Sequence, residues 1–109
     1  MPFFDVTQQP GREVAPGVTI RVAWGEHLMM SFVEFARADA LVPTHSHPHE
    51  QMGMGLAGAF ELIIAGEARI IREGDVYLIP GGVLHSARAV DGPARALDIF
   101  HPVREDYRP

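Results

Sequence analysis

The sequence contains no cysteine and no lysine. Without cysteine, disulfide bonds, thiolate metal sites and cysteine nucleophiles are all excluded. All nine basic side chains are therefore arginines, so an arginine by itself says little about recognition of a carboxylate. The formal net charge of -5 leaves no broad basic face for binding phosphates. We therefore expect no nucleic-acid partner.

Long hydrophobic runs are also missing. The first residues, MPFFDVTQQPGREV, lack a basic start followed by an apolar run, and no stretch approaches the ~20 apolar residues of a membrane span. We expect a cytoplasmic protein without a membrane partner. With 109 residues, 47% of them hydrophobic, the chain is long enough for one core. We predict an irregular N-terminal arm over residues 1–16, rich in proline and glycine, and a single domain over residues 17–109.

Short segments of β type follow one another from Gly17 onward. Predicted strands cover residues 18–24, 28–35, 41–47, 51–57, 59–64, 67–71, 76–79, 83–90 and 94–100, separated by turn residues. No segment has the 3.6-residue apolar period of a helix, and the tail between Pro102 and Pro109 has room for one helical turn. Eight or nine short strands at nearly regular spacing predict an all-β sandwich or barrel.

Three histidines and a glutamine lie within seven positions, namely His45, His47, His49 and Gln51. Side chains two positions apart leave an extended strand on the same side, so His45 and His47 can act as a pair. Two neutral imidazoles beside the amide oxygen of Gln51 form a site for a divalent metal ion, since imidazole suits Zn, Cu, Fe and Ni. For His27 and His101, which lie in turn-like segments, we favour the more common role of a surface or hydrogen-bonded residue.

His49 has two interpretations. It shares the alternation of the other three residues, but Pro48 interrupts a regular extended strand just before it. We therefore place His49 at the rim of the site, and the alternative is that it replaces Gln51 as a ligand.

Two motifs make the sequence similar to the cupin superfamily. The motif G-x5-H-x-H-x3,4-E-x6-G aligns with residues 39–58, where Asp39 replaces the first glycine and Gln51 the glutamate. The motif G-x5-P-x-G-x2-H-x3-N aligns with residues 74–89, where Ala89 replaces the asparagine. The resemblance implies a small double-sheet jelly-roll barrel. It also implies a divalent transition metal ion (nickel, zinc, iron or manganese) bound by His45, His47, Gln51 and His85.

The glutamine in the ligand set has a chemical consequence. A neutral Gln51 leaves a divalent ion its full formal charge of two, whereas a glutamate would remove one unit. The ion would then polarise a substrate carbonyl or enol oxygen more strongly, which favours Lewis-acid over redox chemistry. Its affinity for the site would be lower.

The chain further resembles the small cupins of the KdgF type, in the segments LMMSFVEF, HSHPHEQ, IPGGVLH and LDIFHPVREDY. These proteins act in the breakdown of pectin and alginate. The resemblance implies conversion of an unsaturated cyclic uronate monosaccharide to its linear keto form, with Asp98 as the acid/base and Phe100 and Arg104 completing the site. The segment MGMGLAG departs from the family, so Met52 and Met54 can change the shape of the pocket.

Asp98 also stands out from its own surroundings. In LDIFHPVR it shares one face of the predicted strand with Phe100, and a carboxylate in such an apolar run needs a partner or a role. In a barrel cavity, desolvation would raise its pKa and a metal ion would lower it, a balance suited to proton transfer. The alternative is a salt bridge to Arg95 or Arg104 that fixes the C-terminus. Arg104 itself is either a solvated tail residue or a bidentate clamp for a substrate carboxylate.

Two further functions are compatible with the same motifs. One is a metal-dependent oxygenase or another isomerase, and the other is a non-catalytic sugar-binding module. For any of them we expect a homodimer, because small cupins often pair through an outer sheet. The apolar residues that we assign to this contact are Leu97, Ile99, Ile20, Val22, Phe3 and Phe4.

Overall fold

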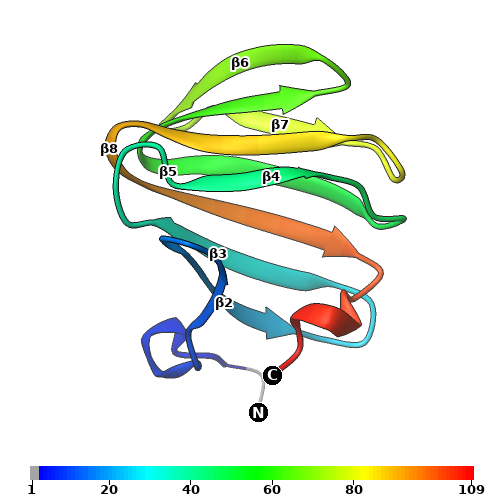
Figure 1. The fold of residues 1–109 in the computed structure, drawn as a ribbon. Coiled ribbons are helices and arrows are strands. Elements are labelled where there is room, and N and C mark those ends of the chain that lie inside the picture. Colours follow the sequence, from blue (N-terminus) through cyan, green and yellow to red (C-terminus); the bar gives the residue numbers. More distant parts are fainter. Residues whose placement is uncertain (1–2) are drawn as a thin grey trace.

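The computed structural model describes residues 3–109, which form eight strands and two short 3₁₀ helices. The strands are β1 (Arg12–Ala15), β2 (Val18–Trp24), β3 (Met29–Phe35), β4 (Leu41–His45), β5 (Glu50–Ile64), β6 (Glu67–Arg72), β7 (Val76–Ile79) and β8 (His85–His101). The helices are η1 (Val6–Gln8) and η2 (Glu105–Tyr107). In this part of the chain no helix is long and apolar enough to cross a membrane. The predicted all-β jelly-roll fold is confirmed (Figure 1).

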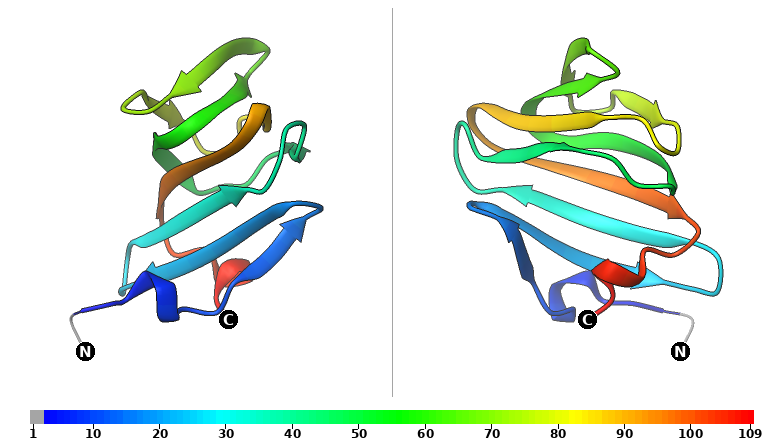
Figure 2. Two further views of the ribbon diagram at one scale, coloured as in Figure 1. Left: turned by 90° about the vertical axis from the view of Figure 1, so that its left-hand side faces the viewer. Right: turned by 45° about the vertical axis from the view of Figure 1, so that its right-hand side comes forward.

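The two longest strands, β5 and β8, pass through both layers of the barrel. The first half of β5 pairs with the second half of β8, and the remaining halves pair with each other beyond a bend. One layer therefore has the strand order β1-β2-β3-β8-β5-β7, and the other has the order β4-β8-β5-β6. Figure 2 shows both long strands curving from one layer into the other.

The bends lie where the sequence predicts breaks between strands. Gly58 has φ +65°, and a Cβ there would collide with the carbonyl oxygen of Pro93 on the neighbouring strand. Asp91 and Gly92 have φ values of +67° and +157° at the facing bend of β8. Because antiparallel pairing continues on both sides of each bend, four of the predicted strands are two continuous strands.

Alternation places one side of each strand in a common interior. On β2 the inward residues are Val18, Ile20 and Val22, each at most 5% exposed. The expectation that Ile20 and Val22 face outward to a second copy was therefore wrong, because their parity on β2 turns them into the core. Phe35 and Phe60 stack in this core with their ring centroids 5.5 Å apart.

The predicted arm contributes a strand to the barrel. Residues Arg12–Ala15 form β1, which pairs antiparallel with β2, so the sheet begins before residue 17. Phe3 and Phe4 are 84% and 47% exposed and do not form part of the core. The strand that carries the first histidine ends at His45 rather than at His47, as expected for a chain that turns at Pro48.

Candidate metal centre and active site

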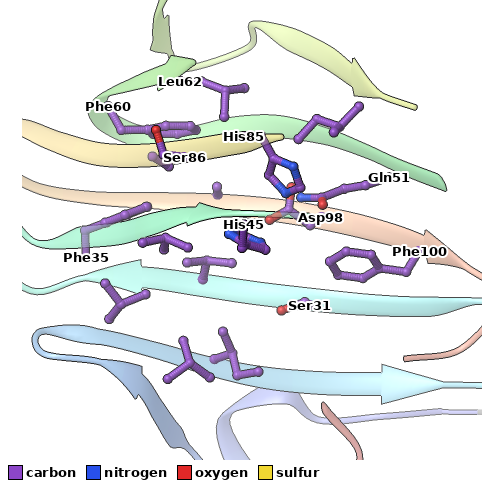
Figure 3. A pocket seen from close by; sticks show the side chains of 18 of the residues that line it. Ser31, Phe35, His45, Gln51, Phe60, Leu62, His85, Ser86, Asp98 and Phe100 are labelled. Carbon is purple, nitrogen blue, oxygen red and sulfur yellow. The ribbon is translucent and has the colours of Figure 1, made fainter. Parts of the chain in front are cut away.

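The structure brings His45, His47 and His85 together. Antiparallel pairing places His45 on β4 directly opposite His85 at the start of β8, with ring centroids 4.3 Å apart. The ring of His47, in the loop after β4, lies 5.7 Å from that of His45 and 5.0 Å from that of His85. One nitrogen of each ring lies within 4.8 Å of the others, so the group could hold a metal ion. Figure 3 shows His45 and His85 pointing into the same cavity.

Backbone carbonyls orient all three rings. The Nδ1 atoms of His45, His47 and His85 lie 2.7, 3.1 and 2.9 Å from the carbonyl oxygens of Pro43, His49 and Val83. A carbonyl oxygen only accepts hydrogen bonds, so a proton on Nδ1 satisfies each contact. Each Nε2 then keeps its lone pair for a metal ion, an arrangement typical of metal-binding histidines.

Gln51 adds an oxygen to this group. Its Oε1 lies 3.1 Å from Nε2 of His47, whose Nδ1 also faces an oxygen. A neutral imidazole has one N–H and cannot donate to both oxygens. If the proton is on Nδ1, a cation placed beside Nε2 would interact favourably with the lone pairs of both Nε2 and Oε1. Three imidazoles and an amide oxygen therefore fit a divalent transition metal ion. The three-histidine group does not include His49, whose ring lies edge-on to His47 at 5.4 Å.

The surroundings favour the neutral forms of His47 and His85. Burial lowers the pKa of His47 to about 4, and the nearby charge of Arg104 and the ring of His85 act in the same direction. The hydrogen bond with Gln51 opposes this shift. Burial also lowers the pKa of His85. Since a histidine must be neutral to bind a metal ion, these shifts prepare the site for binding at neutral pH.

Asp98 is held by residues from two neighbouring strands. In the sheet register, Gly53 on β5 lies between Tyr77 on β7 and Asp98 on β8. The Tyr77 hydroxyl donates a hydrogen bond to Oδ1 of Asp98 at 2.7 Å, and the Gln51 side chain is a second partner. A Cβ on Gly53 would collide with both Tyr77 and Asp98, so the glycine makes this contact possible.

These contacts argue against one of the two interpretations of Asp98. The structure shows no salt bridge from Asp98 to Arg95 or Arg104 within residues 3–109, so the salt-bridge alternative was wrong. Burial raises the pKa of Asp98, while the hydrogen bonds from Tyr77 and Gln51 and the charge of Arg104 oppose the rise. These opposing influences suit a group that exchanges protons.

Arg104 is buried, so the alternative that it is a solvated residue of the tail was wrong. Its Nη2 lies 2.8 Å from Oδ2 of Asp106, and its guanidinium carbon lies 3.7 Å from the ring centroid of Tyr107. The ring of Phe100 lies on another side at 5.1 Å. Asp106 engages Nε and Nη2, which leaves further N–H groups of Arg104 for an anion.

A cavity between the two layers connects these groups. The cavity itself has a volume of about 50 Å³, and it lies within a hollow of about 550 Å³ that includes open solvent. Its polar lining includes Ser31, His45, Gln51, His85, Asp98 and Arg104, and Ser86 also lines it. Phe100 and Tyr107 lie beside them, and the apolar end is lined by Phe35, Phe60 and Leu62 (Figure 3). A cavity of this kind suits a small polar molecule.

Comparison with known proteins identifies the family. A family model of the cupin domain matches residues 31–100. The chain belongs to the cupin family. This cupin is 32% identical over 107 residues to the pectin degradation protein KdgF of Dickeya dadantii (strain 3937). The alignment covers 96% of each of the two chains. The predicted resemblance to cupins of the KdgF type is confirmed.

Solved structures agree with this assignment. The cupin aligns with KdgF from Halomonas sp. at a TM-score of 0.90 and 32% identity, covering 99% of both chains. It also aligns with an RmlC-like cupin from Shewanella frigidimarina NCIMB 400 at a TM-score of 0.91 and 25% identity, covering 99% of this chain and 96% of that one.

Three residues of this cupin's site were not predicted. Ser31 is a polar residue at an inward position of β3, where its inward neighbours Met29 and Val33 are apolar. Tyr77 and Ile79 are the two inward residues of β7. Gly53 is the first of the two glycines in the segment MGMG of β5. The alternation could have identified Ser31 as an inward polar group. Nothing local indicates that Tyr77 reaches across Gly53, because that contact depends on the pairing of distant strands.

Proposed function

We propose that this cupin converts unsaturated cyclic uronate monosaccharides from pectin or alginate to their linear keto forms. The observation that carries the proposal is that Asp98, a buried carboxylate with two hydrogen-bond partners, lines the same cavity as His45 and His85 of the histidine group. The relative KdgF, named for pectin degradation, matches the chain over nearly its whole length. This similarity supports an enzyme that acts on a small sugar acid.

Arg104 and Phe100 bind the substrate in this proposal. Arg104 is fixed by Asp106 and Tyr107, so its remaining N–H groups can meet the uronate carboxylate without loss of side-chain entropy. Phe100 is 2% exposed, and its ring centroid lies 5.6 Å from that of His47. Its ring therefore forms an apolar wall beside the histidine group.

The reaction consists of proton transfers and the breaking of one carbon–oxygen bond of the ring. A divalent ion held by His45, His47, His85 and Gln51 would supply Lewis-acid polarisation of a substrate oxygen. Asp98 accepts the proton of the anomeric hydroxyl, the bond between the anomeric carbon and the ring oxygen breaks, and an aldehyde and an enolate result. Asp98 then returns a proton to the distal carbon of the former double bond, which gives the ketone. Substrate and product have the same atoms, so no oxidant or reductant is required.

The test is loss of the ultraviolet absorbance of the unsaturated uronate. We expect the metal-loaded protein to exceed the spontaneous rate, and Asp98→Asn to lower the rate by about 10²–10⁴-fold. Asp91→Asn, on the same strand but exposed, is the matched control and should keep wild-type activity. A wild type no faster than the spontaneous reaction, or a fully active Asp98→Asn, would refute the proposal. Calorimetric binding without turnover would instead indicate a sugar-binding module.

We also propose that the protein is a homodimer, through a face that differs in part from the predicted one. Two rows of cross-strand neighbours cover the outer face of β3, β8, β5 and β7. They are Met30, Ile99, Met52 and Leu78, and beside them Phe32, Leu97, Met54 and Val76. Both rows are exposed or half-buried, so the face is a continuous apolar surface. A second copy related by a two-fold axis presents the same surface in return.

Light scattering at micromolar concentration tests this pairing. We expect the mass of a dimer for the wild type and of a monomer for Met52→Glu, which places a charge in the middle of the face. Ile70→Glu is the control, since Ile70 is comparably exposed on β6 in the other layer. A monomeric wild type, or a dimer that is indifferent to Met52→Glu, would contradict the proposal.

A further inference from the structure

Ser31 is the buried polar residue of the cavity without a hydrogen-bond partner for its side chain. It is 1% exposed, and its Oγ has no partner among residues 3–109. An unsatisfied hydroxyl in a folded protein costs about 1–3 kcal/mol, since the group loses its hydrogen bonds to water. A residue with this cost and no structural partner suggests a partner that arrives from outside.

The position of Ser31 identifies where that partner would lie. Ser31 on β3 is directly opposite Asp98 on β8 in the sheet register, and both line the cavity. Directly opposed residues have Cβ atoms about 4.5–5.5 Å apart, a gap that one oxygen atom can bridge by two hydrogen bonds. Figure 3 shows Ser31 on the far side of the cavity from His85, in the other layer.

The chemistry of the pair is complementary. Oδ1 of Asp98 accepts one hydrogen bond from Tyr77. Because an ionised carboxylate has about four lone-pair positions, it can accept a hydrogen bond from a further donor. The Ser31 hydroxyl can donate. A sugar hydroxyl placed between the two residues would donate to Asp98 and accept from Ser31 through the same oxygen. A carboxylate or a keto oxygen has no proton for Asp98 and would fit this gap less well.

We propose that Ser31 is a substrate-binding residue that donates a hydrogen bond to a ring hydroxyl of the sugar acid, the same hydroxyl that Asp98 contacts. The inference rests on the proposed function and adds a residue that the motifs do not contain. It gives the site separate contacts for the two kinds of polar group on a uronate. Arg104 meets the carboxylate at one side, and the Ser31–Asp98 pair meets a hydroxyl at another.

Ser31→Ala tests the proposal by two independent measurements. In the metal-free protein we expect an unchanged or higher melting temperature, because the substitution removes an unsatisfied group. In the metal-loaded protein we expect KM for the unsaturated uronate to rise about 2–10-fold, the effect of one neutral hydrogen bond, with kcat changed less than KM. Ser86→Ala is the control, since Ser86 lies at the other end of the cavity beside Phe60 (Figure 3) and should leave KM unchanged.

The two proposals fail in different ways. If the wild type does not turn over the uronate, the proposed function is wrong, and calorimetry with D-galacturonate then reports binding by wild type and Ser31→Ala directly. If the wild type is active but Ser31→Ala has a wild-type KM, the inference about Ser31 is wrong. A lower melting temperature with an unchanged KM would show instead that the hydroxyl supports the fold through a bound water.

Discussion

The two ends of the barrel interior bury opposite kinds of side chain. At one end Phe35 stacks on Phe60, and Leu62 packs beside them, with exposures of at most 4%. At the other end the equally buried positions hold Ser31 and Asp98, each at most 8% exposed. The same long strands, β5 and β8, supply residues to both ends.

This contrast separates stability from chemistry within one small domain. Burying apolar side chains at the packed end stabilises the fold, by about 1.5–3 kcal/mol for a large side chain. Burying a carboxylate, neutral imidazoles and an unpartnered hydroxyl at the polar end costs free energy unless a ligand satisfies them. The free energy gained by apolar burial at the packed end therefore offsets the cost of the buried polar groups at the other end, as is common in active sites.

Removing an aromatic ring from the packed end should have the largest effect on stability. Phe60 is 2% exposed and contacts the rings of both Phe35 and Tyr77. Phe60→Ala should lower the free energy of unfolding by about 3–5 kcal/mol, because it loses apolar burial and leaves a cavity. Urea denaturation of the metal-free protein measures this. A loss below that of the polar-end variants would contradict the division between the two ends.

Acid should destabilise the polar end selectively. In the unfolded chain His47 has the ordinary histidine pKa of 6.5, and in the fold the value falls to about 4. The unfolded state therefore binds more protons between these values, so stability is complete above pH 6.5 and is lost as the pH falls toward 4. The shift corresponds to on the order of 3 kcal/mol for the metal-free protein. His47→Asn should flatten this dependence in thermal melts, and an unchanged slope would contradict the assignment.

Filling the space at Gly53 should have an intermediate effect. A Cβ there collides with Tyr77 and Asp98, so Gly53→Ala should push the Tyr77 ring away and break its hydrogen bond to Asp98. We expect a loss of about 1–3 kcal/mol in stability, typical of an overpacked interior, together with lower uronate turnover. Gly25→Ala is the matched control, because a Cβ at Gly25 meets nothing within 4 Å. Equal behaviour of the two variants would argue against the contact.

The smallest expected effect has the opposite sign. Burial raises the pKa of Asp98, so the folded state binds its proton more tightly than the unfolded state, and stability falls as the pH rises through this range. Asp98→Asn removes that penalty and should stabilise the metal-free protein at pH 7, while it lowers turnover by the factor given above. The two proteins should differ little well below the ordinary aspartate pKa. A less stable Asp98→Asn at pH 7 would show that the carboxylate supports the fold.

Local patterns in the sequence predicted most of the strands, the fold class and the pairing of His45 with His47. Alternation with period two is a property of neighbouring residues, so β2 and β7 have the bounds that the sequence predicts. The spacing of His45, His47 and Gln51 and the second motif around His85 carry the family resemblance. The roles of these residues as ligands, and of Asp98, Phe100 and Arg104 in catalysis, stay predictions that the variants above can test.

Only the tertiary structure decided which of these residues meet and which polar groups remain unsatisfied. The pairing of β3 with β8 places Ser31 opposite Asp98, and the pairing of β7 with β5 lets Tyr77 reach across Gly53. The tail folds back so that Arg104 is buried against Phe100 and Tyr107. Contacts of this kind depend on the register between strands far apart in the chain. No window of neighbouring residues encodes that register, because it is set by the packing of the whole barrel.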